Sequence, residues 1–593
     1  MFNHKHFFVR YCLPALLVVY AISAADQPDT TPIENAGITV HAGGRQVFHG
    51  FGAGQSLWDA QQGYAALPDS IRDTLSRFLY ADLNFRYLRL RSTISECGDT
   101  ADNCASSVYN SYRLLVQDAR KHQPRLTVLL SPQGEIGDDL AGYARRYARQ
   151  IKALRDSGVV IHATGIANEP DWEDYLSAQQ VPQLIRHFRA QLDSAGLADV
   201  KIVAPENSSA DYKAQAFVDS IIADPQALSA LDAFATHSYN WSITEEMNRR
   251  VESYVLSNQK QYWTTEASEF GTEKWEDAKE ASSALSRVYA DMNHLCNVWM
   301  FYVGIKGVET DWRMGGNQNT AFYMILYRTV EKDWGYLLKC WYFKQASRTF
   351  EPGAQLRKST TNLKQLNAKK YWRAEDSTMV YAFGRKAPLY LAAAVNPDGS
   401  WGAGVTNFTG DVMTTPLTSA FTATTYTVTV FIEELADSGD IVFTTSRCNA
   451  TPPYIHREAD VTMHAGVLTI DSLRSFEMIT LRSPPGTMAS RRPTPLPAAA
   501  RQTVPRLRVA APGPAATLAV EFTVLDIPGR IAVPARITAF DGRGRRISEI
   551  FSGRLPPGAH RIIWTPPAHA SGVLLIRLES ATGQDHAKVV IAE

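Results

Sequence analysis

The sequence lacks an excess of charge of either sign, a long apolar run and a cluster of metal-binding residues. Lys and Arg total 60 and Asp and Glu total 60 in 593 residues, so no field of one sign would attract nucleic acid or an anionic membrane. The sequence contains no uninterrupted run of about 18 apolar residues, the length that a membrane-spanning helix needs. It also contains no CxxC pair and no Cys/His cluster, which are the patterns typical of a metal site. We therefore expect neutral partners, no stable membrane insertion, and neither a metal nor an organic cofactor.

The first 25 residues are typical of a secretory signal peptide. Basic residues open the segment, the apolar run 13–22 follows, and the small residues 23–25 end it. The run is too short to span a bilayer. We therefore expect cleavage near Ala25 and a protein that is secreted or held at the cell surface.

Few cysteines remain after the signal segment, and their number limits how they can pair. Cys97 and Cys104 flank a polar loop, so in an oxidising compartment they are candidates for a local disulfide. Cys296, Cys340 and Cys448 are odd in number. At least one of these three thiols is therefore expected to stay free or to pair outside the chain.

Between residues 50 and 305, short apolar or β-branched runs alternate with longer amphipathic stretches. This alternation is typical of repeated βα units and a parallel sheet. Amphipathic stretches such as 141–157 and 180–195 are expected to be helices. Eight apolar runs are expected to be strands and predict an α/β fold, a closed (β/α)₈ or TIM barrel over residues 50–353; they are 50–55, 86–92, 126–131, 159–168, 201–206, 232–238, 261–266 and 297–303.

The remaining chain predicts three further parts. Residues 37–49 and the strand-rich segment 354–482 are expected to form one antiparallel β-domain beside the barrel. Residues 483–514 are rich in Pro, Ala and Arg without periodicity, which predicts a linker. Residues 515–593 hold short strands separated by turn-forming pairs such as Asp541-Gly542, and predict a small β-sandwich.

Two glutamates stand at the ends of predicted barrel strands, where catalytic residues of such barrels lie. The fourth strand ends in Ala167-Asn168-Glu169-Pro170 and the seventh in Trp263-Thr264-Thr265-Glu266. Strands four and seven face each other across an eight-membered ring, so both carboxylates can reach one bond. Retaining glycosidases need two carboxyl groups roughly 5 to 5.5 Å apart. A strand-end glutamate alone is equally explained by a structural ion pair, but the occurrence of both favours glycosidase chemistry, in which Asn168 would donate to the sugar 2-hydroxyl.

The chain from about residue 37 to 482 resembles glycoside hydrolase family 30, whose members share a (β/α)₈ barrel and two catalytic glutamates. The resemblance rests on the order and spacing of several motifs, which are Gly50-Phe51-Gly52-Ala53, Tyr87-Leu88-Arg89-Leu90-Arg91, Asn168-Glu169-Pro170, His237-Ser238-Tyr239, Trp263-Thr264-Thr265-Glu266 and Gln345-Ala346-Ser347-Arg348. It implies that Glu266 is the nucleophile and Glu169 the acid/base. It also implies that Arg89 and Tyr239 keep Glu266 ionised, since a nearby cation and hydrogen-bond donors favour a carboxylate's charged form.

Aromatic side chains near the strand ends are candidates for binding or supporting a sugar. They are Trp58, Trp172, Trp241, Trp299, Tyr302 and Trp312. A single aromatic residue is more often part of a core than of a sugar platform.

The sequence departs from the family pattern at positions that bear on the substrate. Gln133 and Tyr302 stand where members usually have Trp. Members that bind the glucuronic acid branch of xylan use an Arg and a Tyr where this chain has Lys339 and Trp341, and a lysine lacks the fork that fits a carboxylate bidentately. Xylan, β-1,6-glucan and β-1,6-galactan therefore all stay open as substrates.

These features predict a secreted, retaining endo-β-glycanase that acts as a monomer on a polysaccharide. Two alternatives stay open. One is an exo-acting β-glucosidase or glucosylceramidase-like enzyme, and the other is a non-catalytic carbohydrate-binding protein on the same barrel.

The C-terminal segment resembles the immunoglobulin-like sorting domains of the type IX secretion system. The resemblance rests on Ile537-Thr538-Ala539-Phe540-Asp541-Gly542, Leu555-Pro556-Pro557-Gly558 and Gly572-Val573-Leu574-Leu575. It implies that a secretion machinery is a partner and that the chain crosses an outer membrane. A spacer sandwich or a carbohydrate-binding module is the alternative.

Overall fold

A computed structural model divides the chain into two compact units, residues 1–490 and 491–593. It describes most of the first unit and the strands of the second. The described residues are 31–55, 64–93, 106–171, 175–210, 212–239, 252, 254–268, 278–308, 322–328, 330–364, 370–372, 379–381, 387–410, 421–487, 507–510, 518–524, 533–541, 545–555, 558–567, 572–580 and 583–591.

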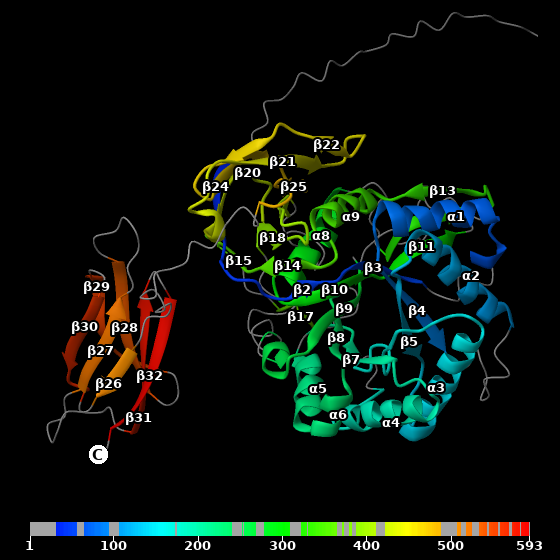
Figure 1. The fold of residues 1–593 in the computed structure, drawn as a ribbon, viewed down its shortest axis with the longest axis horizontal. Coiled ribbons are helices and arrows are strands. Elements are labelled where there is room, and N and C mark those ends of the chain that lie inside the picture. Colours follow the sequence, from blue (N-terminus) through cyan, green and yellow to red (C-terminus); the bar gives the residue numbers. More distant parts are fainter. Residues whose placement is uncertain are drawn as a thin grey trace, which may run out of the picture. The chain divides into compact units, whose positions relative to one another are not determined.

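A closed barrel of parallel strands forms the centre of the first unit (Figure 1). Each strand pairs with the next along the chain, and the last pairs with the first to close the ring. The strands of the ring are β3 (Gly50–Gln55), β4 (Tyr87–Thr93), β5 (Thr127–Gln133), β6 (Ala163–Thr164), β7 (Lys201–Asn207), β8 (Ala233–His237), β9 (Gln261–Ala267) and β10 (Cys296–Phe301). The predicted barrel is therefore confirmed.

The barrel strands begin and end within two residues of their expected bounds, except β6. The sequence predicted a strand over 159–168, but only Ala163–Thr164 pair with their neighbours. The chain then leaves the ladder, and Glu169 takes a left-handed backbone conformation with φ of 47°. Gly165 passes over the buried Glu206, where a Cβ atom would lie 1.7 Å from the carboxylate Oε2. The irregular segment brings Glu169 to the rim of the barrel.

Amphipathic helices cover the outside of the barrel. In α3, the buried residues Tyr143, Tyr147, Ile151 and Leu154 follow one another at helical spacing, and the Asp139 side chain caps the first turn by accepting from the amide of Gly142 at 2.8 Å. None of the helices among the described residues is long and apolar enough to cross a membrane. The helices are α1 (Asp69–Arg77), α2 (Ser106–His122), α3 (Leu140–Asp156), α4 (Val181–Ser194), α5 (Tyr212–Ala223), α6 (Pro225–Ala230), α8 (Ala278–Met292) and α9 (Leu338–Thr349).

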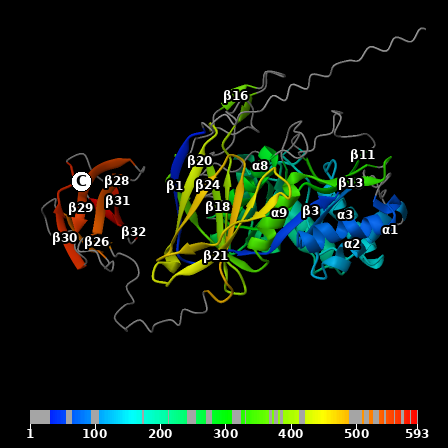
Figure 2. The same cartoon turned by 90° about the horizontal axis from the view of Figure 1, so that it is seen from above.

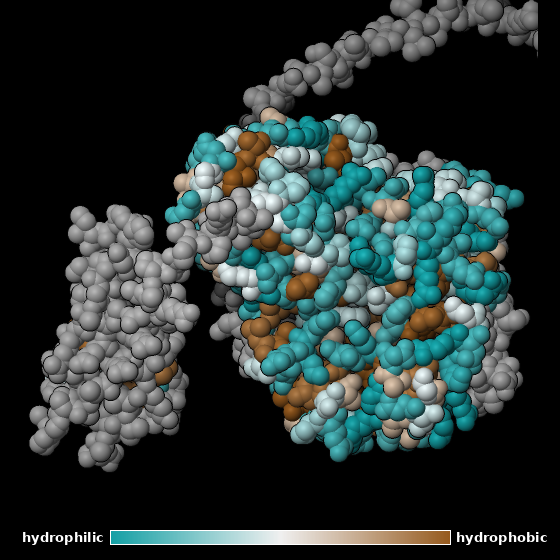
Figure 3. All heavy atoms as spheres, in the orientation of Figure 1, coloured by the Kyte–Doolittle hydropathy of each residue, from teal (hydrophilic) through white to brown (hydrophobic). Residues whose placement is uncertain are grey.

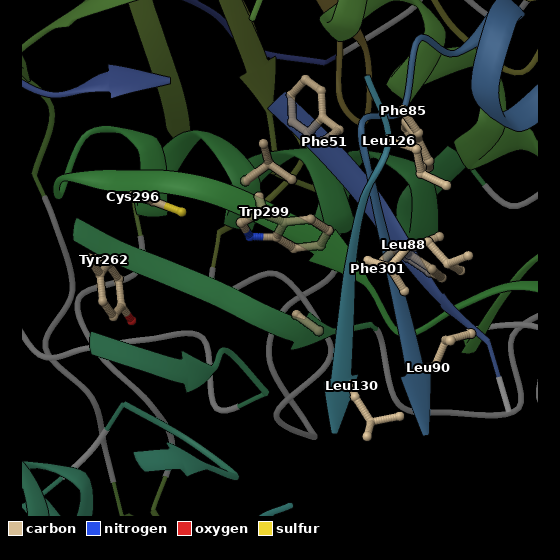
Figure 4. Packing of buried hydrophobic residues seen from close by; sticks show 14 of the residues in the cluster. Phe51, Phe85, Leu88, Leu90, Leu126, Leu130, Tyr262, Cys296, Trp299 and Phe301 are labelled. Carbon is tan, nitrogen blue, oxygen red and sulfur yellow. The ribbon is translucent and has the colours of Figure 1, made fainter. Parts of the chain in front are cut away.

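Two apolar layers hold the barrel together. Alternate strand residues point outward against the helices, among them Leu88, Trp299 and Phe301 in the cluster of Figure 4. The others fill the lumen, where Tyr87 and Trp263 pack edge to face with ring centroids 5.5 Å apart. Hydrophilic residues cover most of the visible face of the first unit, with smaller apolar patches between them (Figure 3).

A β-domain made of segments far apart in the sequence packs beside the barrel (Figure 2). The strand β1 (Ile33–Val40) pairs with β20 (Thr425–Ile432), which begins almost 400 residues later along the chain. One sheet has the order β15-β1-β20-β24 and the other β2-β14-β18-β19-β25-β21-β22, with β23 added on β21. Their bounds are β2 (Val47–Phe48), β14 (Ala354–Arg357), β15 (Ser359–Thr361), β18 (Leu389–Val395), β19 (Trp401–Asn407), β21 (Ile441–Cys448), β22 (Ile455–Arg457), β23 (Val461–Met463), β24 (Val467–Leu473) and β25 (Met478–Arg482).

Two smaller sheets complete the described part of the first unit. One has the order β11-β12-β13, with bounds Val303–Val308, Tyr323–Arg328 and Asp333–Tyr336. The other pairs β16 (Lys370–Trp372) with β17 (Met379–Tyr381). The strands β17, β18 and β20 lie in the segment 354–482, which the sequence predicted to be rich in strands.

The second unit consists of two antiparallel sheets around a small core that includes Val520, Ile537 and Ile576. The strand β26 lies inside the segment predicted as linker, because Leu507–Ala510 pairs with β27. The unit therefore begins earlier than the expected residue 515. The sheets have the orders β26-β27-β30 and β29-β28-β31-β32, with bounds Leu507–Ala510, Leu518–Val524 and Gly558–Trp564 in the first and Arg546–Leu555, Val533–Asp541, Gly572–Ser580 and Gly583–Ile591 in the second.

The thiols of Cys296, Cys340 and Cys448 are free and buried. Burial raises the pKa of Cys296 and of Cys340 to about 12, so both stay protonated and unreactive at neutral pH. The predicted disulfide partners Cys97 and Cys104 lie outside the described residues.

Glycines on β19 let the β-domain approach the barrel helices closely. A Cβ atom on Gly402 would lie 2.2 Å from the carbonyl oxygen of Thr349 in α9, and one on Gly404 would lie 2.3 Å from the Tyr289 hydroxyl in α8. Further along β19, the hydroxyl of Thr406 shares a hydrogen bond of 2.7 Å with the hydroxyl of Ser286 in α8. The two parts of the unit therefore approach each other so closely at these glycines that a Cβ atom would clash, with backbone at Gly402 and with a side chain at Gly404.

We predict that Gly402→Ala destabilises the first unit, because the new methyl group meets backbone atoms that cannot move aside. Overpacking of this kind costs about 1 to 3 kcal/mol of the free energy of unfolding, which urea denaturation followed by fluorescence would measure. Gly439→Ala is the matched control, since a Cβ atom there meets nothing within 4 Å. Equal stabilities for the two variants would contradict the packing argument.

Candidate active site

The two glutamates singled out by the sequence lie together at the C-terminal rim of the barrel. Glu266 lies near the end of β9, and Glu169 follows the irregular segment after β6. The amide of Glu169 donates to the carbonyl oxygen of Glu206 at 3.0 Å, which fixes the backbone that carries it. One carboxylate oxygen of Glu169, one of Glu266 and a ring nitrogen of His237 all lie within 4.8 Å of one another.

A single buried guanidinium connects the strand ends around Glu266. Arg89 on β4 is fully buried and donates from Nη1 to Oε2 of Glu266. From Nη2 it donates to the Ser131 hydroxyl and to Oδ1 of Asn168, each at 2.7 Å. Burial alone would lower the pKa of Arg89, but the negative charges of Glu266 and Glu206 raise it. Arg89 therefore stays charged at every pH at which the protein is folded.

Glu266 is held in its ionised form. Its side chain is 5% exposed, and burial alone would raise its pKa, but His237, Arg89, Arg91 and the hydrogen bond from the Tyr239 hydroxyl lower the pKa to about 2. That hydroxyl donates to Oε1 of Glu266 at 2.7 Å. A carboxylate with both oxygens bound by donors is ionised and fixed in direction.

Glu169 is more exposed than Glu266 and has a different partner. Its side chain is 22% exposed, and its Oε1 lies 2.8 Å from Nδ1 of His237. The other ring nitrogen of His237, Nε2, faces Nη2 of Arg89 at 3.3 Å. Because a carboxylate only accepts, Nδ1 of His237 donates to Glu169. Within the described residues, Oε2 of Glu169 has no hydrogen-bond partner, so this oxygen can contact a substrate.

Two buried polar residues beneath this pair, Glu206 and Asn207, are not among the site residues predicted from the sequence. Glu206 at the end of β7 is fully buried, and its carboxylate lies 3.5 Å from both Arg89 and the Ser131 hydroxyl. The side-chain amide of the next residue, Asn207, is buried without a hydrogen-bond partner in the described structure. The signal for Glu206 was its place at the end of the expected fifth strand, but nothing in its neighbours indicated that Arg89 would reach it.

The trio of Glu169, His237 and Glu266 has the spacing of a metal site, but its hydrogen bonds disfavour one. Both oxygens of Glu266 already accept from Arg89 and Tyr239. A cation at this place would also lie beside the buried positive charge of Arg89. The donor set therefore suits proton transfer better than metal binding.

The two departures from the family pattern meet at one arginine. Arg91 donates from Nη1 to the Tyr302 hydroxyl at 2.6 Å and from Nη2 to Oε1 of Gln133 at 2.8 Å. Its guanidinium carbon also lies 5.4 Å from the centre of the Tyr302 ring. Gln133 and Tyr302 thus form a polar wall next to Glu266, held together by Arg91.

Lys339 is not available to a substrate. Its ammonium group lies 2.8 Å from the Glu280 carboxylate, and both side chains are almost fully buried. Trp341 packs on Phe78, Tyr336 and Tyr454. Lys339 and Trp341, the positions at which the resemblance implied a glucuronic acid site, therefore serve packing in this chain.

The aromatic candidates fall into two groups. Trp58, Trp172, Trp241 and Trp312 lie outside the described residues. Trp299 is buried behind the rim and donates from Nε1 to Asp291 at 2.9 Å. Burial raises the pKa of Asp291 to about 6. Trp299 is therefore a support for the strand next to Glu266 and does not contact a substrate.

Comparisons with known proteins support this geometry over part of the chain. No family model matches the sequence. The glucuronoxylanase XynC of Bacillus subtilis strain 168 is 25% identical over 170 residues, which are 27% of this chain and 37% of the relative. A second Bacillus subtilis glucuronoxylanase XynC is 25% identical over 173 residues, 28% of this chain and 38% of that protein. The chain thus spans little more than a third of the length of these curated relatives.

Solved structures share the fold at lower identity. The glycoside hydrolase family 30 subfamily 8 xylanase Xyn30A from Clostridium acetobutylicum matches with a TM-score of 0.51 and 17% identity over 76% of this chain and 99% of its own. The endo-β1,6-glucanase BT3312 matches with a TM-score of 0.51 and 15% identity over 75% and 93%. SrfJ from Salmonella typhimurium matches with a TM-score of 0.53 and 12% identity over 76% and 92%. These similarities establish the barrel with its attached β-domain.

We predict that Tyr239→Phe moves the acid limb of the pH–rate profile to higher pH. The variant loses a hydrogen bond that favours the charged form of Glu266, so the pKa of that carboxyl rises from about 2. A hydrogen bond to a charged group is worth about 1.5 to 3 kcal/mol, which corresponds to a shift of roughly one to two pH units.

The measurement is kcat/KM against pH, because this ratio reports the free enzyme. Tyr262→Phe is the control. It removes a buried hydroxyl on β9, the strand that also carries Glu266, and this hydroxyl contacts Thr236 and not Glu266. An unchanged acid limb in Tyr239→Phe would refute the role of the hydroxyl.

Proposed function

We propose that this chain is a retaining endo-β-glycanase, with Glu266 as nucleophile and Glu169 as acid/base. The observation that carries the proposal is the approach of their carboxylate oxygens to within 4.8 Å of each other and of His237. Inverting enzymes need a larger separation of roughly 6.5 to 9.5 Å to admit water between the two groups. The short separation therefore favours direct attack by one carboxylate.

In the first step, the ionised Glu266 attacks the anomeric carbon and forms a glycosyl ester. Protonated Glu169 delivers its proton to the departing glycosidic oxygen, which leaves as a sugar hydroxyl. Arg89 and Tyr239 hold Glu266 ionised and aimed.

In the second step, water replaces the leaving sugar. Glu169, now a carboxylate, takes a proton from this water. The water oxygen attacks the anomeric carbon and displaces the carboxylate of Glu266, so the sugar is released with its original anomeric configuration. The hydrogen bond from Nδ1 of His237 occupies one oxygen of Glu169 in both steps. The histidine therefore orients the acid/base without taking part in the proton transfer.

The names of the similar proteins favour a polysaccharide substrate cut within the chain, since they describe xylanases and an endo-β1,6-glucanase. The buried Lys339–Glu280 pair argues against recognition of a glucuronic acid branch at the family position. We therefore favour recognition of the main chain of xylan, β-1,6-glucan or β-1,6-galactan. Chromatography of the products separates this proposal from an exo-acting enzyme, which would release only monosaccharide from the polymer.

Secretion is a separate part of the proposal and rests on the first 25 residues and on the resemblance of residues 515–593 to sorting domains. The two-sheet core of the second unit is compatible with such a domain. Cell fractionation of a chain truncated before the second unit tests it. Retention of the truncated protein in the periplasm would support the sorting role, and unchanged export would refute it.

We predict that Glu266→Ala lowers kcat on an aryl β-glycoside by about 10⁴-fold or more, as expected for loss of a nucleophile. Azide should restore turnover and give a product of inverted configuration, because the small anion fills the place of the carboxylate. Nuclear magnetic resonance of the anomeric proton checks the product.

The control is Glu331→Ala, which removes an exposed carboxylate between β12 and β13 and should leave kcat unchanged. Hydrolysis by Glu266→Ala at the unaltered rate would overturn the assignment. Complete loss without azide rescue, in a folded variant, would count against a glycosyl-enzyme intermediate.

A further inference from the structure

A cavity of about 240 Å³ lies at the end of the barrel where the strands begin, opposite the rim that carries Glu169 and Glu266. His49 precedes β3, Arg86 precedes β4 and Thr127 opens β5. These residues line the cavity together with Arg125 and the Pro352–Gly353 turn. The cavity is far larger than the roughly 10 to 15 Å³ that a water molecule needs, so a group of several atoms fits.

The charges around this cavity are all of one sign. Its lining contains the cationic Arg86 and Arg125 and the titratable His49, and no carboxylate. Burial and the nearby charge of Arg125 lower the pKa of Arg86, and burial and the charge of Lys201 lower the pKa of His49. Two guanidinium groups and an imidazole are thus brought together around one cavity without a carboxylate in its lining.

The nearest acid does not neutralise them. Glu351 acts on Arg86 from a distance, but its carboxylate is bound to Arg482 at 2.5 Å. In the described part of the chain, no ion pair involves Arg86, Arg125 or Lys201, although the first unit contains many others. An anion from solution would therefore be the first partner for these side chains.

The backbone around the cavity is fixed before any ligand arrives. The amide of His49 donates to Asn297 and that of Arg86 to Phe51, both at 2.7 Å. The stem of Arg86 lies over Gly50, where a Cβ atom would be in ordinary van der Waals contact, 3.5 Å, with the Cβ and Cγ atoms of Arg86. The stem of Arg86 is thus held against β3 while its guanidinium reaches the cavity.

We infer that this cavity binds an oxyanion group, a carboxylate, phosphate or sulfate, between Arg86 and Arg125. A guanidinium presents paired N–H donors that match two oxygens of such a group. The hydroxyl of Thr127 and the imidazole of His49 add further donors at the wall. The group is either a free inorganic anion or the acidic group of a sugar, and the two share this recognition chemistry.

The test is isothermal titration calorimetry on the full chain carrying Glu266→Gln, so that no sugar is turned over. Sulfate, phosphate, glucuronic acid and glucose are titrated separately at constant ionic strength. We expect saturable binding of at least one oxyanion and none of glucose. Tighter binding of glucuronic acid than of sulfate and phosphate identifies a sugar-borne acid as the ligand, and the reverse order identifies a free anion.

Substitutions localise the binding. Arg125→Gln, at an exposed side chain, should weaken the affinity for the anion by about tenfold or more, the scale of one charge-assisted hydrogen bond. Arg86→Gln should weaken it further. Arg145→Gln removes an equally exposed positive charge on α3 and is the matched control.

Three results would overturn the inference. They are the absence of saturable binding for every oxyanion, equal binding of glucose, and equal weakening by Arg125→Gln and Arg145→Gln. Because the binding is measured on a catalytically silenced chain, failure here leaves the proposed glycosidase activity untouched. Arg125→Gln should retain normal hydrolysis of a neutral aryl glycoside.

Discussion

The active rim depends on one buried cation. Arg89 has no exposure to solvent and contacts the ends of four other barrel strands or the loops that follow them, through Glu266, Ser131, Asn168 and Glu206. Burying a guanidinium is costly unless carboxylates and hydrogen bonds surround it, so these side chains cannot move independently. The same contacts fix the direction of Glu266, and through His237 they reach Glu169 as well. One network of contacts around Arg89 therefore both stabilises the rim and orients the two carboxylates.

The two carboxylates differ because their surroundings differ. Glu266 receives hydrogen bonds from Arg89 and Tyr239, and its low pKa follows from the charges of His237 and Arg89 and from the Tyr239 hydroxyl, which together overcome its burial. Glu169 has one donor, His237, and a partly exposed side chain. A nucleophile must be ionised and still, whereas an acid/base must meet both a leaving group and water. The difference between the two glutamates therefore arises from the placement of hydrogen-bond donors around chemically identical side chains.

Much of the fold was predictable from local patterns. Apolar runs such as 261–266 and amphipathic stretches such as 141–157 coincide with β9 and α3, because the periods of side-chain burial differ between strands and helices. The prediction failed for β6, where only Ala163–Thr164 pair. There the buried Glu206 and the left-handed Glu169 bend the chain, and neither effect has a local pattern. The strand β26 was missed for a related reason, since its partner β27 supplies the hydrogen bonds that a four-residue segment needs.

The candidate catalytic residues were accessible from the sequence because a (β/α)₈ barrel places every strand end on one rim, so Glu169 and Glu266 had to face a common space once eight strands were recognised. The remaining features depend on contacts between distant parts of the chain. Arg89 and Glu266 are 177 residues apart, and Arg91 and Tyr302 are 211 residues apart. Only the tertiary structure decided that Lys339 is buried against Glu280, that Gln133 and Tyr302 share Arg91, and that unpaired arginines gather at the opposite end of the barrel. Hydrogen bonds and charge pairing act through space, and no periodicity along the chain records which side chains will meet.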